Sequence, residues 1–419
     1  MRRLLLFVLT LRLTPLYGAS SPADPSQVLV IVQDNTGPET GTGGANASQW
    51  VADHYMAARG IPAGNVLHIA TYVEKGNGTS CSPGGTCILN HPSSTVMTYQ
   101  QYLDGIETPL KTKLAANSGA LAASIRYIVP VYGVPYQIRT RTVINTADYL
   151  SIDATISCLN QTLLSLIALG GGIGCINPYW RGDLTSGDPA HLDAFTSTGK
   201  LYVTVRLDGP SALIAAGLVD KAIAAETNGI NRASGIGYFD WQGGGQNNEA
   251  NDSMAATNTA CMAVRGLRCS LNDQSSTGGL ITSAPNTLWA WGWYSGTAVN
   301  DVYTFAPGAV GAQFTSYTAN FIREQGLGSW VPLWLLRGIT ATWGNTGEPS
   351  SQGRGLSTFG DVVLGHLWKG YTFGESYALG TYTFGWMSIG LGDPLYRLKL
   401  IGPSHLGSGA KLSGGATIH

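Results

Sequence analysis

Short apolar runs rich in β-branched residues alternate along this chain with longer stretches whose apolar positions recur every three or four residues. The short runs are typical of buried strands, and the longer stretches are typical of helices. Strands are predicted at residues 27–33, 66–70, 125–131, 201–206, 236–239, 288–292, 338–342 and 396–400. Helices are predicted at residues 48–59, 148–169, 208–228, 248–265, 312–324, 357–367 and 374–379, and from residue 98 with a kink or break at Pro109. This alternation predicts an α/β fold with a mainly parallel sheet and helices on both faces.

The beginning of the chain indicates export. Arg2 and Arg3 precede an apolar run, and the small residue Ala19 follows it at a position suited to cleavage, so residues 1–19 are predicted to be a signal peptide. A mis-assigned start or an uncleaved anchor is the alternative. We expect a periplasmic, extracellular or cell-surface protein with no membrane span after cleavage. The other predicted parts are α/β subdomains at residues 27–195 and 199–402 and a disordered tail at residues 403–419.

Composition and cysteine spacing agree with an exported protein. Charged residues make up 12% of the chain and the formal net charge is −1, so nothing favours a nucleic-acid partner. The six cysteines form three sequence-local pairs, a spacing that favours disulfides in an exported chain. A zinc site is the rival interpretation, but no CxxC motif occurs and no histidine lies at ligand spacing, so we predict no metal or other cofactor. The predicted pairs are Cys81 with Cys87, Cys158 with Cys175, and Cys261 with Cys269.

Polar side chains follow most of the predicted strands, and a parallel sheet would bring them to one edge. Neither a GxSxG, an HExxH nor a Walker motif occurs. The candidates for acid–base chemistry, as in glycoside hydrolysis, are Asp208, Asp240 and Glu348, with Tyr294 and Ser295 as auxiliaries. The candidates for binding a neutral polar ligand, such as a peptide or a glycan, are Asp34, Tyr132, Arg206, Trp293, Trp343 and Asn345. Alternatively, these residues only cap helices and make turns, which is the commonest role of Asp and Asn after a strand.

Two segments of the second half carry a resemblance to a peptidase family. Residues 203–226 look like a strand–helix unit of the gingipain-type cysteine peptidases, and the sequence GDPLYRL at residues 392–398 resembles their C-terminal signature. The resemblance covers about residues 127–400 and implies a caspase-like α/β fold. In that family a catalytic histidine follows one strand and a catalytic cysteine follows the next.

The histidine turn of that family corresponds to residues 292–295 of this chain, and the cysteine position falls near Trp343 and Gly344. Neither turn contains a histidine or a cysteine here. Attack on an amide by a thiolate needs both groups. The resemblance therefore implies the fold without the cysteine-peptidase activity.

Nearly the whole chain also resembles an uncharacterised family of exported bacterial proteins, which is associated with bacteria that sort and anchor surface proteins. Our leading hypothesis is a binding or assembly component at the cell surface, with an unknown peptide, glycan or surface protein as its ligand. The alternatives are a hydrolase that uses the carboxylate cluster and a purely structural protein. The segments that carry the resemblance are residues 58–62, 132–135, 206–210, 292–295, 307–311, 348–349 and 392–394.

Overall fold

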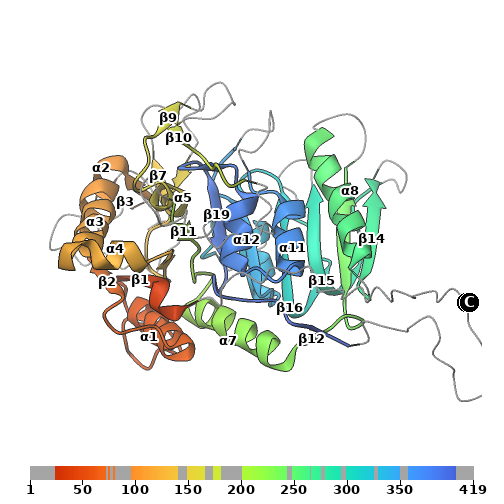
Figure 1. The fold of residues 1–419 in the computed structure, drawn as a ribbon, viewed down its shortest axis with the longest axis horizontal. Coiled ribbons are helices and arrows are strands. Elements are labelled where there is room, and N and C mark those ends of the chain that lie inside the picture. Colours follow the sequence, from red (N-terminus) through yellow and green to blue (C-terminus); the bar gives the residue numbers. More distant parts are fainter. Residues whose placement is uncertain are drawn as a thin grey trace, which may run out of the picture.

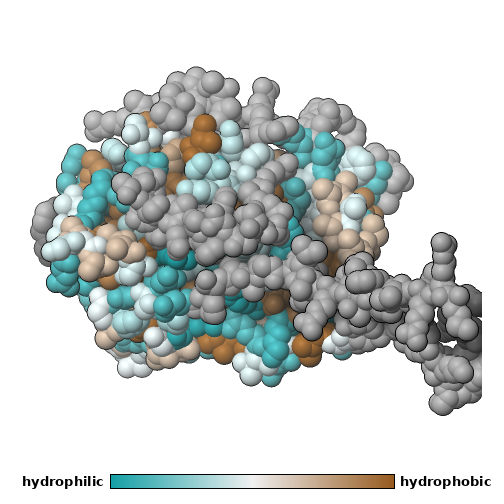
Figure 2. Space-filling view, viewed as in Figure 1, coloured by the Kyte–Doolittle hydropathy of each residue, from teal (hydrophilic) through white to brown (hydrophobic). Residues whose placement is uncertain are grey.

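The two largest sheets of the described chain are flanked by helices, with the first half of the chain on one side and the second half on the other (Figure 1). On the face shown in Figure 2, hydrophobic residues are scattered among hydrophilic ones. The structure is a computed structural model, and it describes residues 24–71, 74–75, 79–80, 96–139, 149–165, 173–180, 201–242, 248–264, 266–274, 279–293, 299–324, 329–349 and 357–402.

A four-stranded sheet forms the first side of the molecule. Its order is β11-β6-β1-β2, and all neighbouring strands run parallel. Every residue of β1 is buried, because Val28 and Val30 face one apolar cluster while Leu29 and Ile31 face another. A continuous apolar run is the pattern expected of a parallel strand covered on both faces. The strands are β1 (Val28–Gln33), β2 (Val66–Ile69), β6 (Tyr127–Pro130) and β11 (Val203–Thr204).

A six-stranded sheet forms the second side. Its order is β14-β13-β15-β16-β17-β19, and only the β17–β19 pair is antiparallel. The strands are β13 (Ile236–Trp241), β14 (Arg268–Asp273), β15 (Ala284–Trp293), β16 (Tyr303–Phe314), β17 (Ala341–Asn345) and β19 (Ser388–Leu391). Together with the flanking helices, the two sheets confirm the predicted α/β fold with mainly parallel strands.

The two sheets are joined where the chain continues beyond β11. Arg206 forms an isolated β-bridge with Leu391 of β19, and Leu207 forms one with Val131 just past β6. The amide of Arg206 donates to the carbonyl of Gly390 at 2.9 Å. The residues after β11 therefore link a strand of each sheet through main-chain contacts.

Helices cover both faces of each sheet. On the four-stranded sheet, α1 packs with α7 on one face, and α3 packs in the cluster on the other face. On the six-stranded sheet, α8, α11 and α12 pack together on one face, and α10 lies on the opposite face, against Gly344. The helices are α1 (Ala47–Arg59), α2 (Tyr99–Tyr102), α3 (Thr108–Ala115), α4 (Ala120–Ser124), α5 (Ile152–Ser157), α7 (Ala212–Asn228), α8 (Asn248–Ala263), α10 (Trp330–Leu336), α11 (Gly360–Trp368) and α12 (Phe373–Gly380).

Short elements complete the described chain. The segment before Pro109 is helical without a break, because the π-helical turn η2 (Leu103–Glu107) joins α2 to α3. The other single-turn helices are η1 (Pro25–Gln27) and η3 (Asn117–Gly119). The remaining strands are β3 (Glu74–Lys75), β4 (Thr79–Ser80), β5 (Val96–Thr98), β7 (Gln137–Arg139), β8 (Tyr149–Ser151), β9 (Leu164–Ser165), β10 (Ile173–Ile176), β12 (Ile230–Asn231), β18 (Thr383–Phe384) and β20 (Leu400–Ile401).

Two predicted helices are wrong. Of the segment predicted at residues 148–169, the described residues 149–165 form β8, the short α5 and β9. The hydroxyls of Thr155 and Ser157 bond to carbonyls four residues earlier and compete with longer helical order. Residues 312–314 belong to β16, and turns follow them up to residue 323. Gly311 allows this strand to lie close to β15, because a Cβ there would come within 2.5 Å of the carbonyl of Ala290. The last strand, predicted at residues 396–400, is instead the two-residue strand β20 (Leu400–Ile401).

Two of the three predicted disulfides lie within the described residues and are confirmed. Cys158 and Cys175 are bonded with Cα atoms 6.4 Å apart, and Cys261 of α8 is bonded to Cys269 of β14 with Cα atoms 6.2 Å apart. The pair Cys81 and Cys87 lies outside the described residues. Disulfides are compatible with an exported protein. Within the described ranges, none of the helices has the length and apolar character needed to span a membrane.

Candidate functional site

The loops that follow the parallel strands of the two sheets meet at one edge. Tyr136 and Gln137, which follow β6, donate to the carbonyl and the side chain of Asn320 at 2.8 and 2.6 Å. Asn320 lies in the turns after β16. From the same turns Arg323 reaches Asp208, which follows β11. The edge therefore contains residues that are far apart in sequence, as the fold class predicts.

A buried network of two arginines and two aspartates holds these loops together. Arg206 is fully buried, and its Nη2 and Nε donate to the two oxygens of Asp153 at 2.6 and 2.9 Å. Its Nη1 donates to Asp208 at 2.7 Å and to the carbonyl of Val134 at 3.0 Å. Arg323 binds the same Asp208 through Nε and Nη2 at 2.9 and 2.7 Å. The two cations and the two carboxylates balance each other, as buried charges require.

The hydrogen bonds of this network leave Arg206 little capacity for a ligand. A guanidinium group has five N–H donors, and Arg206 also uses Nη2 to bind the carbonyl of Pro135 at 3.1 Å. With the contacts to Asp153, Asp208 and Val134, all five donors have partners. Arg206, a predicted binding residue, therefore acts as a connector of loops in the folded chain.

Burial and charge act in opposite directions on the carboxyl groups of the network. Burial opposes the ionisation of Asp208, but Arg323 and Arg206 outweigh it and hold the pKa of Asp208 below its usual value. Burial raises the pKa of Asp153, against the attraction of Arg206. The ionised Asp208 is enclosed by donors from both arginines and from the amide of Gly209 at 2.8 Å. This environment suits a structural ion pair better than a proton donor.

Tyr132 and Asp34, which follow β6 and β1, lie in different environments. The hydroxyl of Tyr132 donates to Glu39, and Glu39 also accepts a hydrogen bond of 2.9 Å from the first amide of α7. Burial raises the pKa of Tyr132 far above its usual value, against the opposing charge of Arg323, so the phenol stays protonated. Asp34 is exposed and pairs with His68 at 2.8 Å. Exposed pairs of this kind contribute little to stability.

Asp240, at the end of β13, is buried among amide donors. Asn272 and Gln274 donate to its Oδ1 at 2.8 and 3.0 Å, and the amide of Ile281 donates to its Oδ2 at 3.3 Å. Asn272 lies in β14 and Gln274 follows that strand, whereas Ile281 belongs to the loop before β15. The carboxylate of Asp240 thus fixes the segment around residue 281 over the strands.

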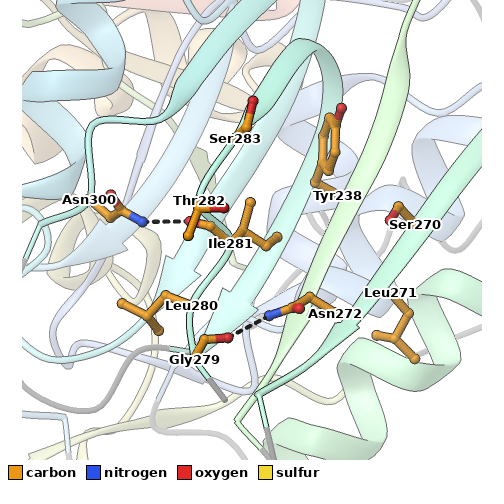
Figure 3. Close-up of a pocket in the computed structure, with 10 residues that line it drawn as sticks. All are labelled: Tyr238, Ser270, Leu271, Asn272, Gly279, Leu280, Ile281, Thr282, Ser283 and Asn300. Carbon is orange, nitrogen blue, oxygen red and sulfur yellow. Dashed lines mark hydrogen bonds between the residues drawn. The ribbon is translucent and has the colours of Figure 1, made fainter. Parts of the chain in front are cut away.

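A pocket of about 680 Å³ is lined in part by Asn272 and Ile281, which donate to Asp240 (Figure 3). The strand register places Tyr238 beside Ser270 and Asp240 beside Asn272, so these four side chains lie on one face of the sheet. Cys269 of β14 points to the other face, where its disulfide joins it to α8. Asn272 donates to the carbonyl of Gly279 and holds the loop that closes the pocket. The ten lining residues are Tyr238, Ser270, Leu271, Asn272, Gly279, Leu280, Ile281, Thr282, Ser283 and Asn300, and none carries a charge.

The remaining candidates lie at the ends of β15 and β17. Trp343 and Asn345 are buried, with 2% and 4% exposure, and their side chains bond to Thr358 and Ser357 before α11. Trp293 is partly buried at the end of β15. Tyr294 and Ser295 lie outside the described residues.

Glu348, which follows β17, is partly buried and accepts a hydrogen bond from the hydroxyl of Ser316. The resemblance places the catalytic histidine at residues 292–295, after β15, and the catalytic cysteine near Trp343, in β17. These two strands are not neighbours in the sheet, because β16 lies between them. The strand that follows β15 in the chain and lies beside it is β16, and Ser316 comes just after it. The contact with Glu348 therefore crosses from the end of β16 to the end of β17.

Several residues of this edge were not among the predicted candidates. Asp153, Ser316 and Arg323 all fall within the two wrongly predicted helices. A helical interpretation places such polar residues on a solvated face, so no signal in the sequence indicated that they meet at this edge. Within the described part of the chain, the His, Cys, Asp and Glu side chains form no group of three or more that could hold a metal ion.

Comparison with solved structures gives distant similarities. The chain is similar to a protease structure at 12% identity, with a TM-score of 0.44 and with 90% of this chain and 78% of that chain covered. It is similar to the complex of Porphyromonas gingivalis RgpB pro- and mature domains at 12% identity, with a TM-score of 0.41 and with 89% of this chain and 79% of that chain covered. A third similarity is to the Saccharomyces cerevisiae separase–securin complex, at 8% identity and a TM-score of 0.27, with 52% of this chain and 17% of that chain covered.

Identities are low and every TM-score is below 0.5, so nothing about this chain is concluded from these similarities. No protein-family model matches the chain. No curated protein matches it either. Membership of the exported, surface-sorting family stays a prediction.

Proposed function

We propose that this protein is an exported binding component on a peptidase-like α/β scaffold, which binds a neutral polar ligand and does not act as a cysteine peptidase. The observation that carries the proposal is the uncharged pocket on β13 and β14. It combines hydroxyl and amide groups, such as those of Ser270 and Asn272, with the apolar residues Leu280 and Ile281. A few polar groups on an apolar lining are typical of small-ligand sites.

The chemistry of the lining favours a short glycan or an uncharged peptide segment. Such ligands present hydroxyls or amides that exchange hydrogen bonds with Ser, Thr and Asn side chains. They also present apolar faces that pack on rings such as that of Tyr238, which lines the pocket. The absence of charged groups from the lining argues against a phosphorylated or strongly ionic ligand, because burying such a charge without a partner is costly.

The described residues also provide no thiolate–imidazole pair. The described cysteines are joined in two disulfides. The described histidines lie elsewhere in the fold: His54 on α1 pairs with Asp220, His68 on β2 pairs with Asp34, and His366 in α11 bonds to the carbonyl of Val362. This arrangement supports a role other than cysteine-dependent peptide cleavage.

The hydrolase alternative, built on Asp208, Asp240 and Glu348, has less support. Asp208 is enclosed by two arginines, and Asp240 is enclosed by Asn272, Gln274 and a main-chain amide. A general acid of a glycosidase must release a proton to the substrate, which these saturated carboxylates are poorly placed to do. A hydrolase of this kind would cleave substrates after thiol blocking and lose activity on Asp208→Asn.

A binding experiment tests the proposal. The purified chain is screened against arrays of neutral glycans and uncharged peptides, and the dissociation constant of each binder is measured by calorimetry. Ser270→Trp should fill the pocket and weaken binding at least tenfold. Ser124→Trp, a matched exposed serine on α4, should leave binding unchanged.

The proposal fails if the wild-type chain binds nothing on either array, or if Ser270→Trp binds as tightly as the wild type. Cleavage of a peptide library that disappears on alkylation of thiols would contradict the second half of the proposal. Far-ultraviolet circular dichroism of both tryptophan variants checks that the fold is retained.

A further inference from the structure

A serine hydroxyl meets a carboxylate beyond the ends of β16 and β17. The Oγ of Ser316 donates a hydrogen bond to the Oε2 of Glu348. Both side chains are partly exposed, so solvent and small molecules can reach them. We propose that Ser316 is a nucleophile and Glu348 its base, acting on the carbonyl of an ester or an amide. This activity is separate from ligand binding at the pocket on β13 and β14.

The backbone next to Ser316 is strained. Tyr317 has a φ angle of 58°, in the left-handed region that residues with a Cβ rarely occupy. Such conformations persist only where the surroundings hold them, which is frequent at functional sites. Here the amide of Tyr317 donates to the carbonyl of Gly347 at 2.9 Å, and the amide of Ala319 donates to the carbonyl of Asn345 at 2.9 Å.

These bonds fix the serine and the carboxylate relative to each other. The turn after β16 is bound through Tyr317 to the very segment that carries Glu348. Beyond Glu348, the carbonyl of Pro349 accepts a hydrogen bond of 3.1 Å from Nε1 of the buried Trp386. The pair is therefore preorganised, which lowers the entropic cost of bringing the base to the nucleophile.

The chemistry of the pair is that of an activated hydroxyl. A serine hydroxyl is a weak nucleophile until an adjacent base accepts its proton. The Oγ of Ser316 forms a bond to the carbonyl carbon, and its proton passes to Glu348. The bond to the leaving alcohol or amine then breaks, and the leaving group takes that proton. Water attacks the acylated serine, releases the carboxylic acid and restores the hydroxyl.

The surroundings of the pair favour a substrate with an apolar acyl group. Trp293 and Phe314 end the neighbouring strands β15 and β16, and they are paired in the strand register. Their rings meet edge to face with centroids 6.1 Å apart, and both are partly exposed. Phe314 precedes Ser316 by two residues, so the end of β16 offers flat apolar surface to an acyl chain or an aromatic side chain.

A fluorophosphonate probe tests the inference on the full chain. This reagent phosphonylates an activated serine, with loss of fluoride and of the hydroxyl proton. The wild type should gain one label, which peptide mapping places on Ser316. Ser316→Ala should remove the label. Glu348→Gln keeps the size of the side chain and removes the base, so it should slow labelling about 100-fold or more.

Controls separate reactivity from folding. Ser234→Ala removes an exposed serine in a distant turn and should label at the wild-type rate. If Ser316→Ala lowers the melting temperature, Ser316→Cys serves instead, because it keeps the size of the side chain, and it should also lose the fluorophosphonate label. The inference is overturned if the wild type is not labelled, if the label lies on another serine, or if Glu348→Gln reacts as fast as the wild type.

Discussion

Replacing Asp208 by asparagine removes one of two carboxylates that neutralise two buried arginines. Asp208 is fully buried and accepts from Arg206 at 2.7 Å and from Arg323 at 2.9 and 2.7 Å. After the substitution, Asp153 alone faces both cations. Breaking a buried pair on one side typically costs about 3–5 kcal/mol, because it leaves a buried charge without a partner. We expect Asp208→Asn to lower the free energy of unfolding by this amount.

Urea denaturation followed by tryptophan fluorescence measures the effect. The matched control is Asp301→Asn, which breaks an ion pair between Asp301 and the exposed Arg337 and should change stability little. The reasoning is refuted if Asp208→Asn costs less than about 1 kcal/mol or no more than Asp301→Asn. The double variant Asp208→Asn with Arg323→Gln leaves one cation and one carboxylate, so its cost should be smaller than the sum of the single costs.

The pH dependence gives an independent check on Asp208. Because the arginines hold its folded pKa below the usual value, its contribution is fully present above the unfolded pKa of about 3.9. That contribution is lost as the pH falls through the lower, folded pKa. The difference in stability between the wild type and Asp208→Asn should therefore be constant near neutral pH and shrink below about pH 4.

Three further substitutions test other parts of the fold. Burial lowers the pKa of Lys221 to about 8 from 10.5, so Lys221→Met should stabilise the protein at pH 7 by roughly 1–3 kcal/mol. In urea titrations this gain should fade between about pH 8 and 10.5, because the wild type becomes more stable as Lys221 loses its charge. Gly133→Ala should cost roughly 2 kcal/mol or more in thermal unfolding, because φ is +97° and the new Cβ would lie 2.2 Å from Oγ1 of Thr36; an unchanged melting temperature contradicts this. Replacing Cys261 and Cys269 by serine should cost about 2–3 kcal/mol in urea without reductant, and equal stability with and without the bond would refute it.

The strand and helix pattern was largely predictable because it depends on local sequence. The buried strand β1, the helix α1 and the helices α11 and α12 follow apolar runs or periodic apolar positions, and each is confirmed. The strand β16 was not predictable in this way. Its residues Pro307, Gly308 and Gly311 weaken a strand pattern, and the neighbouring strands β15 and β17 supply the hydrogen bonds that make it a strand.

The candidate residues were predicted by their position after strands, and their roles in binding or catalysis stay predictions. Arg206 and Asp208 do converge at one edge, but they bind each other and the arginine of a distant turn. Asp240 reaches the pocket only as the anchor of its wall. Local sequence indicates that a polar residue follows a strand, but it does not indicate whether the partner is solvent, a ligand or another side chain.

The sequence by itself determined the α/β class, the disulfide pairs Cys158–Cys175 and Cys261–Cys269, and the absence of a histidine or cysteine from the expected turns, because each depends on composition or short spacing. The tertiary structure alone decided which polar groups meet. Arg206 and Asp153 are 53 positions apart, Arg323 and Asp208 are 115 apart, and Ser316 and Glu348 are 32 apart. Strand order and register bring these groups into contact, and both are set by packing across the whole chain rather than by any local pattern.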